Sequence, residues 1–207
     1  MFHITTVELG TYQLLQQLFE LPVINTGFAL AGGTSLSLQI GHRKSIDLDI
    51  FSAADFSVDE LEIELRSSGF ADIVVLNKNR RMLFTRINGI KCDFVQEPAK
   101  ILEKYIKLEN SFLYSMPDIG AMKLHTICGR GKRKDFFDIY CLLQQFTWEQ
   151  LLAFFEQKYS SDQLYFLWRS ILYFNDADDD FEIDGLGQFN VSWEKIKDYI
   201  IATCTEL

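Results

Sequence analysis

The sequence is poor in proline and cysteine, and it has no long apolar run. Only three prolines and four cysteines occur among 207 residues, which excludes collagen-like and disulfide-dense classes of protein. The longest uncharged apolar stretch, residues 23–40, contains Asn25, Thr34 and Gln39 and is too polar to span a bilayer. The first 21 residues lack the basic start, apolar run and small-residue cleavage site of a secretory leader. We therefore expect a cytoplasmic protein without a membrane helix.

The cysteine spacing and the charge balance exclude further classes. The four cysteines are separated by 36, 13 and 63 residues, which matches neither a zinc knuckle nor a disulfide framework, so we expect reduced, mostly buried thiols. Basic residues number 20 against 29 acidic ones, and residues 151–207 alone carry 4 basic and 11 acidic groups. A surface that coats nucleic acid generally is therefore not expected, although a local basic patch can still guide a polyanion.

Hydrophobic spacing predicts a front half that mixes helices with strands. Helical spacing covers residues 6–21, which Pro22 terminates, and residues 57–68. A short apolar run before Gly32 predicts a strand that turns into a short helix, and Asn88-Gly89 is a strong hairpin signal. The expected strands cover residues 28–31, 45–51, 73–76, 82–87 and 90–95, with residues 77–79 separating the third from the fourth.

From residue 101 onward the patterns are mainly helical, with a helix start at residues 116–118 and a break at residues 129–131. We expect an α+β protein with an α/β core in residues 1–110 and a helical domain that completes the site in residues 111–207. The acid-dense residues 176–184 are interpreted as a solvated loop. A calcium loop is the sharper alternative, but the stretch lacks the glycine and the glutamate that an EF-hand places at positions six and twelve.

Asp47-Leu48-Asp49 is the first pattern with chemical meaning. Residues i and i+2 of a strand point the same way, with Cα atoms roughly 6–7 Å apart, so the two carboxylates can share cations. Like charges crowded in this way raise one pKa unless a counter-ion is present, which makes a divalent metal a natural partner. Two Mg²⁺ ions about 3.5–4 Å apart would activate an attacking hydroxyl and hold nucleotide phosphates. The plain alternative is the solvent face of an amphipathic strand.

Gly32-Gly33-Thr34 lies 15 residues upstream of this pair, at the expected turn from strand to helix. Glycines let the backbone approach an anion closely, the helix N-terminus adds partial positive charge, and Thr34 or Ser35 adds a hydroxyl. A simple tight turn with a helix cap is the alternative. The nearby aspartates favour phosphate binding.

Asp93 lies on the expected strand over residues 90–95. It is either a third metal ligand, a group that orients an acceptor hydroxyl, or an exposed acid on an edge strand. The sequence pattern does not decide among these roles.

Residues 123–138 form the last pattern, in which two expected helices meet at a glycine-containing joint. Lys123 lies on the first helix, and Asp135 and Asp138 share a face of the second. Asp135 can hold Lys123 in position, and cations at the joint can neutralise a triphosphate or admit a polyanionic acceptor. The alternative is a solvated basic turn. We identify the joint as the only dense basic cluster of the chain, made of Arg130, Lys132, Arg133 and Lys134.

In order and spacing, these patterns resemble the AbiEii/AbiGii-type nucleotidyltransferases. These are toxin components of bacterial toxin–antitoxin and abortive-infection systems within the DNA polymerase β-like superfamily. The resemblance covers residues 25–145, and no resemblance is identified beyond Gln145. Its matching parts are residues 32–38, residues 41–51, Asp93 and residues 123–138.

The resemblance implies a nucleotidyltransferase-type mixed β-sheet flanked by helices and followed by a helical C-terminal half. It also implies NTP as substrate and Mg²⁺ or Mn²⁺ as the metal, bound by Asp47, Asp49 and Asp93. The implied catalytic residues are these three aspartates with Lys123 and Asp135, and the implied nucleotide-binding residues are Gly32, Gly33, Thr34, Ser35, Lys123 and Arg130. The acceptor varies among relatives, so a tRNA 3′ end and a protein hydroxyl are both candidates, and a cognate antitoxin is a candidate partner.

Three hypotheses follow. The first is an enzyme that moves a nucleoside monophosphate from NTP to a hydroxyl with release of pyrophosphate. The second is a catalytically silent regulatory module that binds NTP without turnover. The third is an interaction domain whose acidic C-terminal half docks a basic partner such as an antitoxin.

Overall fold

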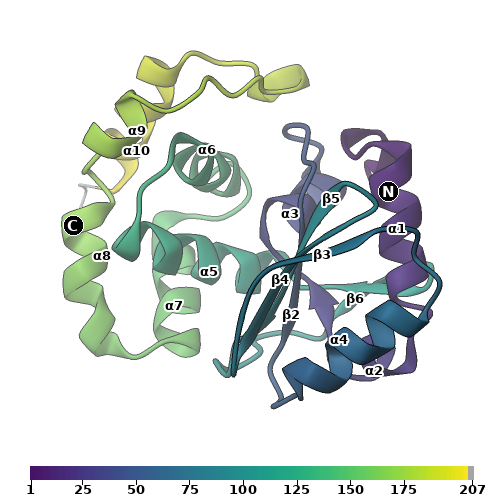
Figure 1. The fold of residues 1–207 in the computed structure, drawn as a ribbon. Coiled ribbons are helices and arrows are strands. Elements are labelled where there is room, and N and C mark those ends of the chain that lie inside the picture. The colour runs from purple at the N-terminus through teal and green to yellow at the C-terminus, as the bar shows by residue number, and fades with distance from the viewer. Residues whose placement is uncertain (205–207) are drawn as a thin grey trace.

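A seven-stranded mixed sheet forms the centre of the protein in the computed structural model, which describes residues 1–204 (Figure 1). The strands are β1 (Ala29–Leu30), β2 (Leu48–Ser52), β3 (Ile73–Asn79), β4 (Met82–Ile87), β5 (Ile90–Gln96), β6 (Ile106–Leu108) and β7 (Ser111–Leu113). Their order in the sheet is β3-β4-β5-β2-β1-β7-β6. The pairs β2–β5 and β1–β7 are parallel, and the other neighbouring pairs are antiparallel.

Helices lie on both sides of this sheet. The helices are α1 (Leu9–Leu18), α2 (Pro22–Gly27), α3 (Gly32–Ile40), α4 (Val58–Ser67), α5 (Met116–Gly129), α6 (Arg133–Leu142), α7 (Trp148–Lys158), α8 (Leu164–Ser170), α9 (Asn175–Asp178) and α10 (Trp193–Cys204), with short 3₁₀ turns at Ile4–Thr6, Ser161–Gln163 and Gly187–Phe189. Figure 1 shows α1, α2 and α4 on one side and α5 to α10 on the other. Among residues 1–204, no helix combines the length and the apolar character needed to cross a membrane.

Two apolar clusters hold these layers together. One packs α1 and α4 against the inward side chains of the sheet, such as Ile50 and Phe94. The other gathers the helices from α5 onward around Phe136, Trp148 and Phe155. Helix α3 joins the two, because Leu38 belongs to the first cluster and Leu36 to the second. The N-terminus of α3, with Gly32 and Gly33, is therefore held between the sheet and the helical half.

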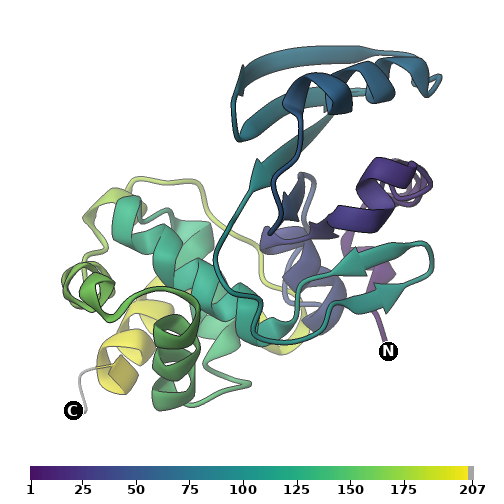
Figure 2. The ribbon, with the colours of Figure 1, turned by 90° about the horizontal axis from the view of Figure 1, so that it is seen from below.

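The β3–β4 hairpin projects from the rest of the sheet. Figure 2 shows it with α4 packed against it, standing away from the helical half. The Asn88-Gly89 turn between β4 and β5 is confirmed, and both of its residues have the positive φ angles that this turn requires, 50° and 82°. Among residues 1–204, no helix covers the face of β3, β4 and β5 on the side of α5 (Figure 2).

The α+β class with a nucleotidyltransferase-type sheet is confirmed, with local corrections. Pro22 follows the first helix but also begins α2, where a proline is tolerated because its missing N–H needs no partner. Residues 77–79 belong to β3, so the turn falls at Arg80 and Arg81. The β6–β7 hairpin was not expected, because strands of three residues are too short to show alternation.

Three further predictions concern the domain boundary, the acid-dense stretch and the cysteines. Strand β7 lies beyond residue 110 and pairs with β1, so the sheet extends past the expected boundary, and the division into two domains stays a prediction. The acid-dense stretch was expected as a loop, yet its first residues form α9, and Asp178 accepts hydrogen bonds from Trp193 and Lys197. The four cysteines are free thiols, and three of them are buried.

Candidate active site

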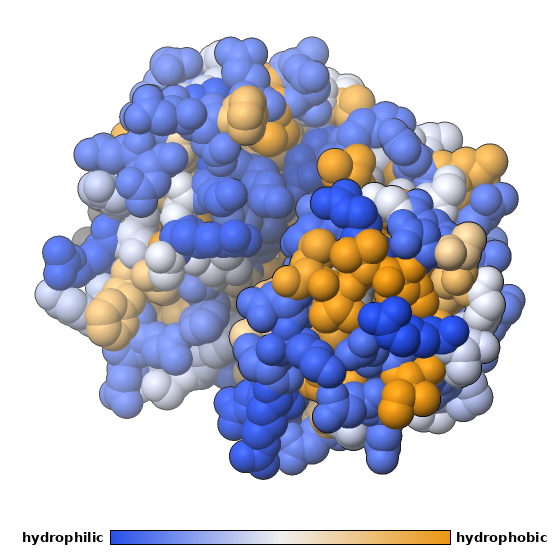
Figure 3. Space-filling view, viewed as in Figure 1, coloured by the Kyte–Doolittle hydropathy of each residue, from blue (hydrophilic) through white to orange (hydrophobic). Residues whose placement is uncertain are grey.

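A cavity of about 950 Å³ lies between the open face of the sheet and the α5–α6 pair. Figure 3 shows the surface hollowed between the two halves. This volume falls in the range of small-molecule sites. Its walls include Gly32 and Gly33, all three predicted metal ligands, Lys123, Arg130 and Asp135. Eight of the ten predicted site residues therefore meet at one cavity.

The Gly32-Gly33 turn forms one wall and touches two charged groups. Gly32 has a φ of 64°, and a Cβ added there would lie 2.2 Å from Asp49 Oδ2. A Cβ on Gly33 would lie 2.0 Å from an Nη atom of Arg43. Both glycines are thus required by close approach, and Gly32 also by its left-handed backbone. The turn leaves room for a carboxylate and a guanidinium directly against the backbone.

Thr34 and Ser35, predicted to contact phosphate, do not line this cavity. Both are buried, and the Thr34 hydroxyl bonds to Ser45 Oγ at 2.7 Å and to the carbonyl of Asp47. The Ser35 hydroxyl lies 3.5 Å from the carbonyl of Tyr114. The Thr34 hydroxyl thus fixes the loop that leads into β2 and acts on the position of Asp47, whereas the Ser35 hydroxyl contacts the segment after β7.

Asp49 and Asp93 face each other on neighbouring strands. The parallel register of β2 and β5 pairs them directly, and Asp47 precedes β2 at the same cavity wall. Burial raises the pKa of Asp49, and the carboxylates of Asp93 and Asp47 raise it further against the opposing charges of Lys123 and Lys91. The protein therefore holds like charges together at a cost that a bound cation would relieve.

The donor set at these carboxylates suits a divalent cation. Lys91 binds Asp93 Oδ2 at 2.5 Å, whereas Asp93 Oδ1 is buried without a hydrogen-bond partner among residues 1–204. Carboxylate oxygens are the ligands that Mg²⁺ and Mn²⁺ prefer. Within the described part of the chain, no three His, Cys, Asp or Glu side chains converge closely enough to make a complete metal site as they stand. The residues fit a cation that also takes ligands from substrate or water.

Alanine at Gly32 should disturb the Asp49 carboxylate. We expect Gly32→Ala to lower the free energy of unfolding by at least about 1–2 kcal/mol, the cost of a left-handed backbone for an L-residue, and to impair any activity that needs Asp49. Gly10→Ala is the control, because nothing lies within 4 Å of an added Cβ in α1; alanine there should stabilise by up to about 1 kcal/mol. Urea unfolding measures both, and equal effects would contradict the close approach.

Lys123 and Asp135 meet on the opposite wall. Lys123 Nζ lies 2.9 Å from Asp135 Oδ1 and 2.7 Å from Asp138 Oδ2, and all three side chains are buried. Burial opposes the charge of Lys123, but the carboxylates of Asp138 and Asp135 outweigh it and raise its pKa. Lys123 is thus a fixed cation at the cavity. Asp135 Oδ2 is buried with no partner among residues 1–204, and Arg130 lies exposed at the rim.

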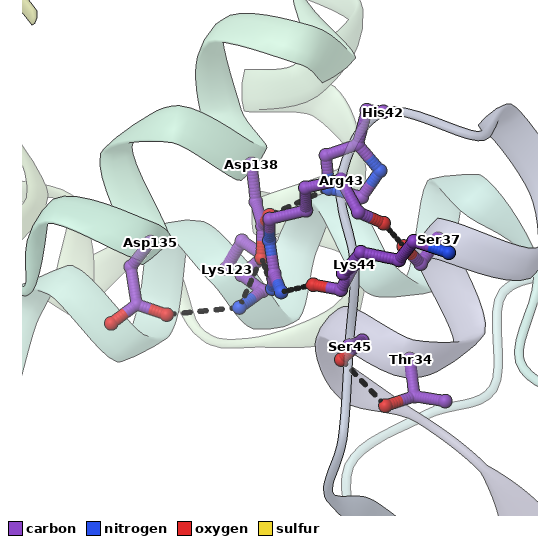
Figure 4. A network of polar contacts seen from close by, with 9 residues as sticks. All are labelled: Thr34, Ser37, His42, Arg43, Lys44, Ser45, Lys123, Asp135 and Asp138. Carbon is purple, nitrogen blue, oxygen red and sulfur yellow. Dashed lines mark hydrogen bonds and ion pairs between the residues drawn. The ribbon is translucent and has the colours of Figure 1, made fainter. Parts of the chain in front are cut away.

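Asp138, which the sequence placed only beside Asp135, is the centre of a buried network (Figure 4). It is fully buried and receives His42 Nε2 and Arg43 Nε, each at 2.7 Å, and a second Arg43 nitrogen at 3.0 Å. Burial alone would raise the pKa of Asp138, but Arg43, Lys123 and His42 hold it well below its usual value. Asp138 therefore ties the loop before β2 to Lys123 on α5.

Sequence patterns carried two signals for this network. Arg43 lies four residues before Asp47, inside the stretch that carries the resemblance, and Asp138 lies one helical turn after Asp135. The pattern showed that the two aspartates share a helix face, but it did not show which of them receives the arginine. That distinction depends on contacts between residues 95 apart in the chain.

Comparisons with known proteins show the family to which the chain belongs. Residues 13–197 match the family described as "Nucleotidyl transferase AbiEii toxin, Type IV TA system", a longer stretch than the motifs alone cover. An uncharacterized protein of Aquifex aeolicus is 28% identical over 191 residues, which cover 90% of each chain.

Two solved structures share the fold. MenT4, a nucleotidyltransferase toxin of Mycobacterium tuberculosis, matches with a TM-score of 0.58 and 14% identity over 95% of this chain and 83% of that one. ANT(2″)-Ia, solved in complex with adenylyl-2″-tobramycin, matches with a TM-score of 0.54 and 13% identity over 78% of this chain and 99% of that one. At such identities these likenesses show the fold alone, whereas the family match covers most of the sequence. The chain therefore belongs to the AbiEii family of nucleotidyltransferase toxins and is a transferase of the nucleotidyltransferase type.

Proposed function

We propose that this protein moves a nucleoside monophosphate from NTP to a hydroxyl acceptor in a reaction that depends on a divalent metal, and that it is the toxin of a bacterial toxin–antitoxin or abortive-infection system. The observation that carries the proposal is the cavity itself. Asp49 and Asp93 face Lys123 there, beside the Gly32-Gly33 turn. Carboxylates that can bind a metal cation and an ammonium that can bind phosphates thus line the same cavity.

Asp47, Asp49 and Asp93 would hold Mg²⁺ or Mn²⁺. Support comes from Asp93 Oδ1, which is buried without a hydrogen-bond partner in the described part of the chain, and from the raised pKa of Asp49, which burial and the neighbouring carboxylates produce. When bound, the metal supplies charge compensation to the phosphates and acidity to the acceptor hydroxyl.

Phosphates would bind between the Gly32-Gly33 turn and Lys123. Both glycines of the turn line the cavity, and the ammonium of Lys123 is held in place by ion pairs with Asp135 and Asp138. An ammonium fixed in this way costs no reorganisation when negative charge builds up on the leaving pyrophosphate. Asp135 is a positioning residue in this scheme, and Arg130 at the rim is a further candidate contact for phosphate.

The acceptor, the partner and the cellular location belong to the proposal. The family description names a toxin of a toxin–antitoxin system, which supports a cognate antitoxin as partner. The candidate acceptors are a tRNA 3′ end and a protein hydroxyl, and the location that we propose is the cytoplasm.

Transfer to cellular acceptors tests the proposal. The protein is incubated with each NTP in turn, labelled at the α-phosphate, with total RNA or total protein, and with Mg²⁺ or with EDTA. We expect one macromolecular fraction to acquire label only with the metal, and re-addition of Mg²⁺ after EDTA to restore it. NTP binding without transfer to either fraction would favour the silent regulatory module.

A further inference from the structure

The strands on the open side of the sheet carry an unbalanced positive charge. Between Asp72 and Asp93 the sequence contains five basic residues and no acidic one, in a chain whose net charge is −9. The prediction that the joint between α5 and α6 is the only dense basic cluster is therefore wrong. Three of the five are exposed arginines without an ion pair among residues 1–204: Arg80 and Arg81 at the β3–β4 turn, and Arg86 on β4.

Part of the α5–α6 joint, in contrast, packs against the acidic C-terminal segment, although Arg130 and Lys132 stay exposed and, with Lys134, also line the cavity. Arg133 donates hydrogen bonds to the carbonyls of Ala177, at 3.0 Å, and Asp178, at 2.6 Å, and its guanidinium lies 5.2 Å from the Trp193 ring centre. Arg130 and Lys132 border a small hollow together with Asp176, Asp179 and Asp180. A polyanion that approached Arg130 and Lys132 from this hollow would meet these carboxylates.

On the cavity side of the sheet, the carboxylates continue into an aromatic and basic surface. The strand register places Asp49 beside Asp93 and Asp93 beside Phe84, which also lines the cavity. Adjacent strands are about 4.8 Å apart, so Phe84 lies roughly 10 Å from Asp49 in this row. Arg86 lies two residues beyond Phe84 on the same face, directly opposite Lys91. Lys91 is paired with Asp93, whereas Arg86 donates to the carbonyl of Gly89 and has no carboxylate partner among residues 1–204.

The direction of transfer assigns this surface to one of the two substrates. In an in-line displacement the attacking hydroxyl enters opposite the leaving group. The pyrophosphate would leave on the side of the Gly32-Gly33 turn and Lys123, so the hydroxyl must enter past Asp93, where Phe84 lies. The base of the NTP is joined to the phosphate through the ribose and does not lie on the line of displacement. The apolar side chains of Ile119 and Met122 on α5, which line the cavity, remain as its contact.

We propose that the face of β3, β4 and β5 binds the single-stranded end of a nucleic acid acceptor, an inference that rests on the proposed nucleotidyl transfer. Phe84 stacks on the terminal base, and Arg86 with the turn arginines Arg80 and Arg81 contacts the phosphates. The alternation of a flat ring with cations matches a chain in which bases alternate with phosphates. This surface, termed here the acceptor face, comprises Arg80, Arg81, Phe84 and Arg86.

Charge reversal at the turn tests the acceptor face. Arg80→Glu/Arg81→Glu is compared with Lys104→Glu/Lys107→Glu, which makes the same change in net charge at exposed positions near and on β6, the opposite edge of the sheet. The probe is a single-stranded oligoribonucleotide with a free 3′ hydroxyl, and its affinity is measured at several salt concentrations. We expect the arginine variant to lose at least about tenfold in affinity and about 1.4 in the log–log salt slope, 0.7 per lost phosphate contact. The lysine variant should match the wild type.

NTP affinity, measured on the same samples, should be unchanged in both variants. Unchanged oligoribonucleotide affinity and slope in the arginine variant would overturn the acceptor face, as would label that enters protein instead of RNA. If the wild type binds the oligoribonucleotide on this face but transfers no label, then the proposed function fails while the binding surface stands.

Phe84→Leu separates the acceptor from the NTP base. Leucine keeps the apolar volume of a partly buried position but removes the flat ring. We expect the KM for the oligoribonucleotide to rise by about tenfold or more, as stacking on aromatic side chains predicts, and the KM for NTP to stay the same. A rise in the KM for NTP alone would assign Phe84 to the nucleotide base and contradict the proposal.

Discussion

Replacing Asp49 with asparagine is expected to reduce nucleotidyl transfer by at least about 10²-fold, the scale seen when one electrostatic stabiliser is removed from an active site, while the protein stays folded. Asp49 lies against the Gly32 backbone and beside Asp93, so asparagine fits the space but loses the charge that a cation needs. Transfer of labelled nucleotide and thermal melting, recorded on the same sample, separate lost chemistry from lost folding.

The same substitution should stabilise the metal-free protein in a pH-dependent way. Burial and the neighbouring carboxylates raise the pKa of Asp49, so the folded state holds the Asp49 proton more tightly than the unfolded state does. The protein therefore loses stability as pH rises from the unfolded-state pKa of about 4 to the higher folded-state pKa. Asparagine mimics the protonated form, so its melting temperature should exceed the wild-type value at pH 7 and converge with it below about pH 4.

Asp72→Asn is the matched control, since Asp72 is exposed just before β3. This variant should keep full transfer and an unchanged melting curve. Full activity in Asp49→Asn, or a fall in its melting temperature at pH 7 without metal, would remove Asp49 from the proposed cation site.

Replacing Asp138 with asparagine is expected to give the largest loss of stability among these variants. Asparagine nearly preserves shape, but it leaves Arg43 and Lys123 buried with one carboxylate fewer between them. Removing one partner from a buried ion pair costs about 3–5 kcal/mol. Urea unfolding at pH 7 should show a fall of this size in the free energy of unfolding.

The difference from the wild type should shrink in acid. Arg43, Lys123 and His42 outweigh burial and hold the pKa of Asp138 far below its usual value. The carboxylate therefore stabilises the fold above the unfolded-state pKa of about 4, and this contribution is lost as pH falls toward the folded-state pKa. Asp178→Asn, which removes an exposed carboxylate paired with Lys197, is the control and should change stability far less. A gap that stays constant down to low pH would contradict the network.

The sequence predicted those parts of the site that depend on local geometry. Gly32-Gly33 is recognisable because a left-handed backbone and close approach both demand glycine. The expected strand over residues 45–51 begins only at Leu48, so Asp47 lies just before β2, yet it lines the cavity together with Asp49. Lys123 and Asp135 flank a helix break that the sequence shows directly. In these cases the residues that define the geometry are also the ones that meet the cavity.

What the sequence did not predict depends on contacts between distant segments. The role of Asp138 requires the loop at Arg43, and the covering of Arg133 requires carbonyls more than forty residues downstream. The hydroxyls of Thr34 and Ser35 turn inward because Ser45 and Tyr114 lie beneath them. Strand β7 pairs with β1 and β6 pairs with β7, so strands this short are stabilised by their neighbours and not by a pattern of their own.

Comparison of NTP labelled at the α-phosphate with NTP labelled at the γ-phosphate tests the central claim most directly. Both are incubated with the protein, Mg²⁺ and total cellular RNA, and macromolecular label and pyrophosphate are measured together. Transfer of a nucleoside monophosphate predicts that α-label enters the acceptor, that γ-label leaves in pyrophosphate, and that the two amounts are equal. Incorporation of the γ-label, or release of phosphate with no label in any acceptor, would contradict nucleotidyl transfer by this site.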